Sequence, residues 1–464
     1  MLSFFRINDP FRILGIALLL IILSIPYILM DIPLLSPELS WMLIGERMSA
    51  GHFLYVDIID DIGPLSAYTY WAIDFLVGRS WWTYKILASL IILFQIYYVN
   101  GLLTQYRAFE ESSYIPALVM VVLFHLSFDF LTLSPTLLGS TFIVLALGQL
   151  FSQTLINEQN TESILLVGIF GGLAACFHFP LVIFLPFLII AGISVSGFSF
   201  NQLLLALFGY FQPFLLCCIY FFWIGALQEF INEFILATRV RGSYPHVTYI
   251  DLTILIATPI AFSVFGYLVG TVTKSITVNQ QKQKQLMIIF SIIAPLSIIL
   301  ANRRTPYQMV VFLPGLTYFI SQIFVYVRNK KQLNLLFYLF ILLIPLVGYS
   351  WAIYKSQPNK NWNYTLNEKV QNEGKKIVVL GDNISPYLGN TLASPYLNYR
   401  LSKRVLTNYE SHEKMIEVYL HFQKEKPEVI YDQEGTFSEL LKHIPALAEM
   451  YTEKSQGIYQ LINN

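Results

Sequence analysis

The chain has 464 residues, of which 55% are hydrophobic and only 12% are charged, and its formal net charge is zero. A soluble protein carries about 25% charged residues, so the composition excludes an ordinary soluble domain, and the balanced charge gives no sign of nucleic-acid binding. Several apolar runs reach the ~20 residues that a helix needs to cross a bilayer. The sequence therefore predicts an α-helical polytopic membrane protein.

The first predicted element is a membrane-spanning helix. Arg6 and Arg12 precede the apolar run "ILGIALLLIILSIPYILM". This run is longer than the apolar core of a signal peptide and lacks a small-residue cleavage site. We therefore expect an uncleaved helix whose basic N-terminal end lies in the cytoplasm.

Residues 31–63 form the first external loop in this topology. "PELSWMLIGERMSAG" has the spacing of an amphipathic helix, which we expect to lie along the membrane surface and to end at Gly51. The next stretch, "LYVDIIDDIGPL", contains Asp57, Asp60 and Asp61. These carboxylates either belong to a solvated loop or, held near the membrane by the apolar residues between them, contact substrate or a cation.

Ten further apolar segments follow and bring the prediction to 11–12 transmembrane helices. They lie at 64–77, 82–104, 114–130, 135–153, 163–195, 202–224, 252–272, 286–302, 306–327 and 332–354. Whether 64–77 crosses the membrane stays open. "CFHFP" interrupts 163–195, which is either one kinked helix or two short ones. His178 in this break is either a functional group or a histidine satisfied by hydrogen bonds between helices.

Charges in the later loops predict the orientation. "KSITVNQQKQKQ" (274–285) and "VRNKKQ" (327–332) carry basic residues and no acid, so both are expected in the cytoplasm. "NRRTP" (302–306) then lies outside. Guanidinium groups pair with phosphate oxygens in bidentate fashion, so Arg303 and Arg304 suit a lipid phosphate, with snorkelling to headgroups as the alternative.

A second external loop is predicted at 225–251. It begins with a short amphipathic helix, "LQEFINEFIL", and continues with Arg239 and Arg241. This loop either covers a site like a lid, with the two arginines in contact with substrate, or anchors at the interface.

The composition changes after residue 355, where the predicted membrane domain (1–355) ends. In 356–464, "IVVLGDN", "PEVIYD" and "GIYQLI" are predicted strands, and they alternate with amphipathic helices. This pattern predicts a small α/β domain outside the cytoplasm. No glycine-rich phosphate motif follows the first strand, so docking or acceptor contact is expected rather than nucleotide binding.

The layout resembles the GT-C superfamily of membrane glycosyltransferases, in particular dolichyl-phosphate-mannose-type protein mannosyltransferases and lipid A aminoarabinose transferases. The resemblance covers residues 10–355 and the C-terminal domain. It rests on "SPELSWMLIGERMSAGHFLYVDIIDDIGPLSAYTYW", "GGLAACFHFPLVIFLPFLII" and "RRTPYQMVVFLPGL". The chain departs from the family pattern at four places: Pro37 before the acid, Ile62 for a lysine, Phe177-His178 for a threonine-lysine pair, and Ser134 for an aspartate.

The resemblance implies transfer of a sugar from a polyprenyl-phosphate donor to a protein, lipid or glycan acceptor, at the outer face of the cytoplasmic (inner) membrane. Glu38 takes the place of the catalytic acid, and Arg303, Arg304 and Tyr307 take the place of the donor phosphate site. No cofactor is required, although Glu38, Asp57 and Asp60 could hold a divalent cation, as in the oligosaccharyltransferase branch.

Two alternatives remain. A flippase or transporter of lipid-linked sugars would show paired broken helices in matching halves and charges at the middle of the membrane, and the sequence shows neither. A non-catalytic scaffold subunit of an envelope complex would keep the fold and lose family residues, as the four departures allow.

Overall fold

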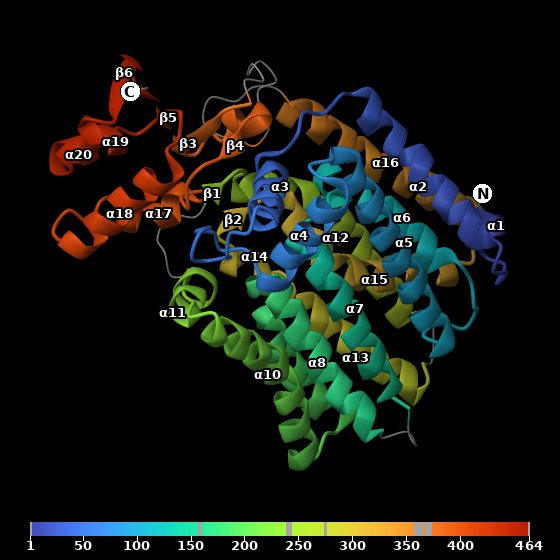
Figure 1. Ribbon diagram of the computed structural model, residues 1–464. Coiled ribbons are helices and arrows are strands. Elements are labelled where there is room, and N and C mark those ends of the chain that lie inside the picture. The colour runs from blue at the N-terminus through green and yellow to red at the C-terminus, as the bar shows by residue number, and fades with distance from the viewer. Residues whose placement is uncertain are drawn as a thin grey trace. The chain divides into compact units, whose positions relative to one another are not determined.

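A computed structural model gives the fold of the chain (Figure 1) and describes residues 2–155, 160–237, 244–272, 276–356, 364, 366 and 374–462. The chain divides into two compact units. Unit 1 comprises residues 1–32, 81–217 and 247–354, and unit 2 comprises residues 33–80, 218–246 and 355–464. Unit 2 thus joins the C-terminal residues with both predicted external loops.

Unit 1 is built from apolar helices. In chain order its elements are α1 (Leu2–Phe5), α2 (Arg12–Leu29), α5 (Trp81–Gln105), α6 (Ile115–Phe124), η1 (Phe128–Leu131), α7 (Pro135–Ser152), α8 (Thr161–Phe177), η2 (Phe179–Ile183), α9 (Phe184–Ala191), η3 (Gly192–Ser196), α10 (Phe200–Trp223), α12 (Tyr249–Val272), α13 (Val278–Ile293), α14 (Leu296–Leu300), β2 (Arg303–Arg304), η6 (Pro306–Phe312), α15 (Leu313–Tyr326) and α16 (Lys330–Ser356). The last residues of α10 and α16 belong to unit 2.

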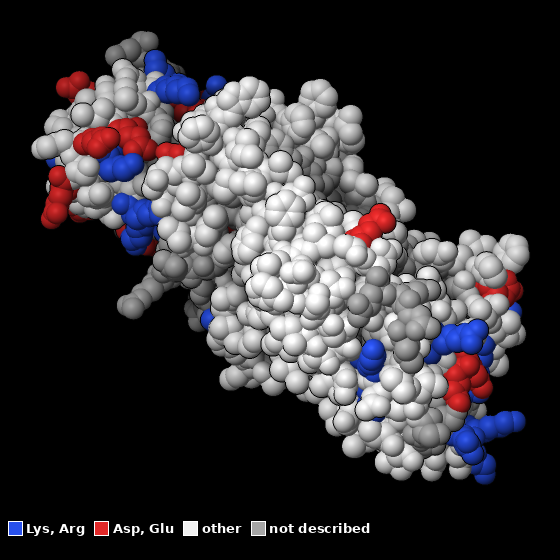
Figure 2. All heavy atoms as spheres, turned by 90° about the horizontal axis from the view of Figure 1, so that it is seen from below, with Lys and Arg blue, Asp and Glu red and all other residues white. Residues whose placement is uncertain are grey.

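The predicted class, a polytopic helical membrane protein, is confirmed. In the described part of the chain, nine helical segments are long and apolar enough to cross a membrane, and α6 and α8 are shorter apolar helices. The sequence predicted 11–12 transmembrane helices, and nine segments reach that length in the described residues. In the apolar window of η6–α15, 94% of the residues are buried, compared with 22% in that of α2, so η6–α15 lies inside the helix bundle and α2 lies at its surface. The face drawn in Figure 2 has wide areas without a charged side chain, as a lipid-facing surface requires.

The break at "CFHFP" separates two elements. α8 ends at Phe177, His178 is extended with φ −147° and ψ 106°, and η2 begins at Phe179. Pro180 explains the break, because proline lacks an N–H group and its ring clashes with the preceding turn of a continuous helix. The second of the two alternatives, two short segments, is therefore the one that the structure has.

A similar interruption shortens the predicted helix 114–130. The helix α6 ends at Phe124, and a separate 3-10 turn, η1, follows at Phe128–Leu131. The apolar composition of the whole stretch concealed this break, because hydropathy does not distinguish a helix from a buried turn.

Unit 2 begins with a pair of short helices, α3 (Ser36–Ser49) and α4 (Pro64–Val77). The two backbones approach closely at Gly45, where a Cβ atom would lie 2.6 Å from the carbonyl oxygen of Tyr70. Gly51, at φ +91°, follows the end of α3, as predicted. α4 has 14 residues and is too short to span a bilayer as a straight helix.

The C-terminal part of unit 2 contains a five-stranded mixed sheet in the order β4-β3-β5-β7-β6. Its elements are β3 (Lys376–Leu380), η7 (Ser385–Gly389), β4 (Thr391–Leu392), α17 (Tyr399–Leu406), α18 (His412–Glu425), β5 (Val429–Asp432), α19 (Thr436–His443), α20 (Pro445–Ala448), β6 (Tyr451–Ser455) and β7 (Ile458–Leu461). β3 pairs in parallel with β4 and β5, and β7 is antiparallel to β5 and β6. The predicted strands correspond to β3, β5 and β7, whereas β4 and β6 were not predicted.

Two residues from outside the sheet domain belong to its hydrophobic core. Ile59 of the first external loop and Ala237, which follows η4 (Ile231–Ile235), are buried in the same cluster as Val378, Ile430 and Phe437. The short helix α11 (Leu227–Phe230) directly precedes η4. Burial of these side chains explains why both loop regions form one compact unit with the C-terminal domain.

Candidate functional site

A polar cluster in unit 1 is centred on Gln308 of η6. Its amide oxygen lies 2.8 Å from Nε2 of His178 and accepts a hydrogen bond of 3.1 Å from the hydroxyl of Thr136. Its amide nitrogen donates to the carbonyl oxygen of Arg303 at 3.4 Å. The cluster therefore connects the first turn of α7, the break after α8 and the arginine pair, three segments far apart in sequence.

The Gln308 contact defines the chemistry of the His178 imidazole. An amide oxygen only accepts hydrogen bonds, so Nε2 carries the proton and Nδ1 is the basic nitrogen of the neutral ring. His178 is only partly buried. The contact with Gln308 thus fixes the orientation of the His178 imidazole.

His125 shows the contrasting, purely structural arrangement. It is fully buried, its Nδ1 lies 2.8 Å from the carbonyl oxygen of Val121, and its Nε2 lies 3.1 Å from the hydroxyl of Ser24. Both ring nitrogens are thus engaged within the helix bundle.

Helix starts around the Gln308 cluster are capped by side chains. Asp129 is fully buried, and one carboxylate oxygen accepts a hydrogen bond of 2.9 Å from the backbone N–H of Tyr307, near the start of η6. Ser134 accepts from the backbone N–H of Leu137 at 3.0 Å and caps α7. These caps satisfy N–H groups that lack partners within their own helices and hold the segments around Gln308 in place.

The predicted phosphate-binding residues lie beside this cluster. Arg303 and Arg304 are half-buried, and the guanidinium of Arg304 lies 3.7 Å from the centre of the Tyr249 ring. Stacking on an aromatic ring fixes the plane of a guanidinium and leaves its edge available for an anion. Tyr307 is buried, with 2% of its surface exposed, so its side chain is part of the packing around the site.

Glu38 lies in unit 2, at the third position of α3. The residue is 2% exposed, and one carboxylate oxygen accepts a hydrogen bond of 3.4 Å from the backbone N–H of Leu35, the N-cap residue of α3. Pro37 occupies the first turn, where proline fits without loss of a hydrogen bond. The predicted catalytic carboxylate is therefore fixed on a helix rather than on a mobile loop.

The three aspartates of the acidic loop bind parts of the protein itself. The carboxylate of Asp57 accepts from the N–H of Phe53 at 2.9 Å, and that of Asp60 accepts from the N–H of Ile62 at 2.9 Å. Asp61 accepts from the side-chain amide of Asn398 at 3.4 Å. Contacts of this kind shape the loop and dock it on the C-terminal domain, which accounts for a cluster of acids in an otherwise apolar chain.

Arg47, which sequence reasoning did not single out, organises this region. It is 5% exposed and donates to the carbonyl oxygens of Asp57 and Leu392, both at 3.0 Å, and to the carboxylate of Glu425 at 2.8 Å. Leu392 and Glu425 lie more than 340 positions away along the chain. No local pattern could therefore have identified these partners.

Arg79 makes a second connection within unit 2. Its guanidinium donates to the carbonyl oxygen of Tyr387 at 2.7 Å and lies 3.5 Å from the carboxylate of Glu46 on α3. Burial raises the pKa of Glu46, and the nearby Arg79 partly opposes this shift. Glu46 is thus a carboxyl group with raised proton affinity on the same helix as Glu38.

The second external loop also docks within unit 2. Glu233 of η4 is buried and forms an ion pair with Arg404 of α17. The predicted substrate contacts Arg239 and Arg241 lie outside the described residues.

The carboxylates do not form a metal site. Among the described residues, which include Glu38, Asp57 and Asp60, no group of three or more His, Cys, Asp or Glu side chains is placed to hold a metal ion. Asp57 and Asp60 instead use carboxylate oxygens to accept backbone N–H groups. The residues therefore do not fit the divalent cation of the oligosaccharyltransferase branch.

Comparisons with known proteins identify the fold. No family model and no curated protein matches the sequence. The structure is similar to that of ArnT from Cupriavidus metallidurans bound to undecaprenyl phosphate, with a TM-score of 0.52, 10% identity and coverage of 98% of both chains. It is also similar to the Archaeoglobus fulgidus oligosaccharyltransferase tethered with an acceptor peptide containing the NVT sequon, with a TM-score of 0.52, 12% identity and coverage of 98% of this chain and 74% of that one. Both neighbours are GT-C proteins, and the chain has the GT-C fold.

Proposed function

We propose that the protein is an integral membrane glycosyltransferase that transfers a sugar from a polyprenyl-phosphate donor to a protein, lipid or glycan acceptor. The observation that carries this proposal is the similarity in fold to ArnT bound to undecaprenyl phosphate, which extends over 98% of both chains. The reaction takes place at the outer face of the cytoplasmic membrane, with the N-terminus in the cytoplasm and residues 356–464 outside.

Arg303 and Arg304 are the proposed contacts of the donor phosphate. When the bond between the sugar carbon C1 and the phosphate oxygen breaks, negative charge develops on the departing polyprenyl phosphate. A positioned guanidinium stabilises such charge in a site that excludes water. The stacking of Arg304 on Tyr249 supports this role, because a guanidinium with a fixed plane loses little entropy on binding.

Glu38 is the proposed general base. The acceptor hydroxyl or amine attacks C1 from the face opposite the phosphate, its proton passes to the Glu38 carboxylate, and the sugar inverts its configuration. The fixed position of this buried carboxylate at the start of α3 supports the role, because a base that is already oriented loses little further entropy when the acceptor binds. Asp57, Asp60 and Asp61, with His178, are proposed to shape the substrate site, and no step uses a metal.

A transfer assay with a labelled polyprenyl-phosphate sugar tests this assignment. Glu38→Gln keeps the size of the side chain and loses the base, so transfer should fall by roughly 10²–10⁴-fold. Glu413→Gln is the matched control, because Glu413 is an exposed residue of α18, and it should keep wild-type activity. A folded Glu38→Gln protein with full activity would end the assignment, and inactivity of the wild type with every donor would favour the scaffold alternative.

A further inference from the structure

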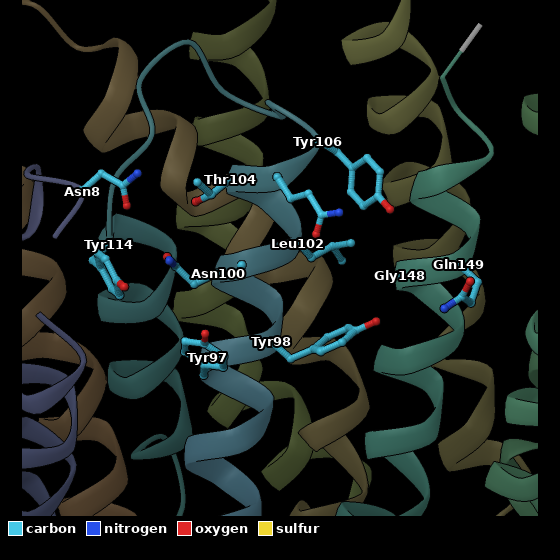
Figure 3. A pocket seen from close by; sticks show the side chains of 12 residues that line it. Asn8, Tyr97, Tyr98, Asn100, Leu102, Thr104, Tyr106, Tyr114, Gly148 and Gln149 are labelled. Atoms are coloured by element: carbon cyan, nitrogen blue, oxygen red, sulfur yellow. The ribbon is translucent and has the colours of Figure 1, made fainter. Parts of the chain in front are cut away.

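Unit 1 contains a pocket of about 530 Å³ away from the Gln308 cluster (Figure 3). It is lined by the C-terminal part of α5, the start of α6, the N-terminal segment and α7. On α7 it reaches Gly148, which lies 12 residues beyond Thr136, or about 18 Å along the helix axis. The pocket is therefore separate from the proposed transfer site.

The lining of the pocket is polar but carries no Lys, Arg, His, Asp or Glu side chain. It contains the four tyrosines Tyr97, Tyr98, Tyr106 and Tyr114, together with side-chain amides and one threonine. Figure 3 shows Tyr98 reaching from α5 toward Gly148 of α7. The lining offers no counter-charge to an ionised ligand, and its amides and phenols suit an uncharged polar one.

Some side-chain amides of the lining are available to form hydrogen bonds with a ligand. Within the described residues, the side chains of Gln105 and Gln149 make no hydrogen bond to the protein, although each amide has two donors and one acceptor. Asn100, in contrast, accepts from the backbone N–H of Ala117 at 3.2 Å and so caps α6. The side chain of Asn8, like those of the two glutamines, makes no hydrogen bond to the described part of the protein, so Asn8, Gln105 and Gln149 are lining amides with unused hydrogen-bonding capacity.

We infer that this pocket binds an uncharged sugar. The ring hydroxyls of a sugar match amides and phenols that both donate and accept, and its C–H groups are attracted to the negative face of a tyrosine ring. The volume lies within the roughly 300–1,000 Å³ of small-molecule sites. Such a ligand could be either a free sugar or the sugar headgroup of a neutral glycolipid. The site is independent of the proposed transfer reaction.

Gly101 offers a way to block the pocket. It lines the cavity, and a Cβ atom built at this position has no other atom within 4 Å. Leucine is also a better helix former than glycine, so Gly101→Leu fills the space without opposing the fold of α5. Gly148 would be a poor choice, because its Cβ would lie 2.1 Å from the Tyr98 hydroxyl oxygen.

The test measures binding to the full chain, purified without sugar detergents and placed in phosphatidylcholine nanodiscs. Maltose, monoglucosyl-diacylglycerol and phosphatidylserine are titrated separately. We expect the glucolipid to bind, Gly101→Leu to abolish binding, and Gln149→Ala to weaken it roughly fivefold. The matched control Gln332→Ala, at an exposed position of α16, should leave binding unchanged.

The probes separate the two sources, because binding of maltose as well indicates a free sugar and binding of the glucolipid alone indicates a headgroup. The inference is overturned if neither sugar binds, if Gly101→Leu and Gln149→Ala both bind as the wild type does, or if phosphatidylserine displaces the glucolipid. If Gly101→Leu does not fold, the comparison of Gln149→Ala with Gln332→Ala decides. None of these readouts requires transfer activity.

Discussion

Replacing Arg47 by alanine should release the acidic loop from the C-terminal domain. The side chain of Arg47 is 4% exposed and that of Glu425 is 14% exposed, so both charges are largely removed from water. Loss of one partner from such a pair costs about 3–5 kcal/mol, and the two carbonyl groups that also lose their donor add to this cost. Because Glu425 retains some contact with solvent, we expect the lower end, about 3 kcal/mol.

Hydrogen–deuterium exchange measures this effect locally. The backbone N–H of Ile59 donates to the carbonyl oxygen of Pro395 at 2.8 Å, so it is protected only while the loop is docked. A loss of about 3 kcal/mol should speed its exchange by roughly 100-fold. Lys442→Ala is the control, because its ion pair with Glu439 is exposed and is worth at most about 1 kcal/mol.

The result that would refute this reasoning is an Arg47→Ala protein in which the Ile59 amide exchanges less than about twofold faster than in the wild type. In that case the apolar burial of Ile59 alone would hold the loop, and Arg47 would be dispensable.

Two further predictions concern the donor site and the C-terminal domain. Arg304→Ala should weaken binding of undecaprenyl phosphate by roughly 10- to 150-fold, which corresponds to the loss of one charge-assisted hydrogen bond. The control Arg328→Ala, at an exposed position, should have little effect, and equal affinities of the two variants in an equilibrium binding assay would contradict the prediction. Burial lowers the pKa of His421, which contacts the Tyr396 hydroxyl at 3.0 Å, so the folded state binds its proton less tightly than the unfolded state. The contribution of neutral His421 to stability is present above the unfolded pKa of about 6.5 and is lost as the pH falls below that value. His421→Gln should therefore reduce the decline in melting temperature between pH 7 and pH 5, and an identical decline in the variant and the wild type would contradict this prediction.

The helical fold was predictable because the apolar runs are long. A helix in a membrane must satisfy its backbone within the segment, so hydropathy and length identify it without reference to distant residues. The same reasoning found the start of η6 at Pro306, after Arg303 and Arg304, and the end of α3 before Gly51. These are local signals, carried by proline and glycine.

The strands β4 and β6 escaped prediction for a physical reason. β4 has two residues, and "YTEKS" in β6 is exposed at all but its first position, so neither shows the alternation of a half-buried strand. Their conformation depends on pairing with β3 and β7. Tertiary contacts, rather than local propensity, decide such edge strands.

The candidate site was predictable only in part. Glu38 was singled out through resemblance to GT-C patterns. His178, Arg303 and Arg304 were singled out as ionisable groups within or beside apolar segments, whereas Gln308 carries no pattern of its own. Its importance follows from the hydrogen bonds that it makes with segments 130 and 172 positions away along the chain. Such an arrangement exists only in the folded protein.

The fate of the donor tests most directly whether the protein is a glycosyltransferase. A single-turnover experiment with wild-type protein in nanodiscs would use a polyprenyl-phosphate sugar labelled in both the sugar and the lipid, together with candidate acceptors. A glycosyltransferase breaks the bond between sugar and phosphate, so we predict one free polyprenyl phosphate for each sugar that reaches the acceptor. An intact donor that only changes its side of the membrane would contradict the account and identify a flippase.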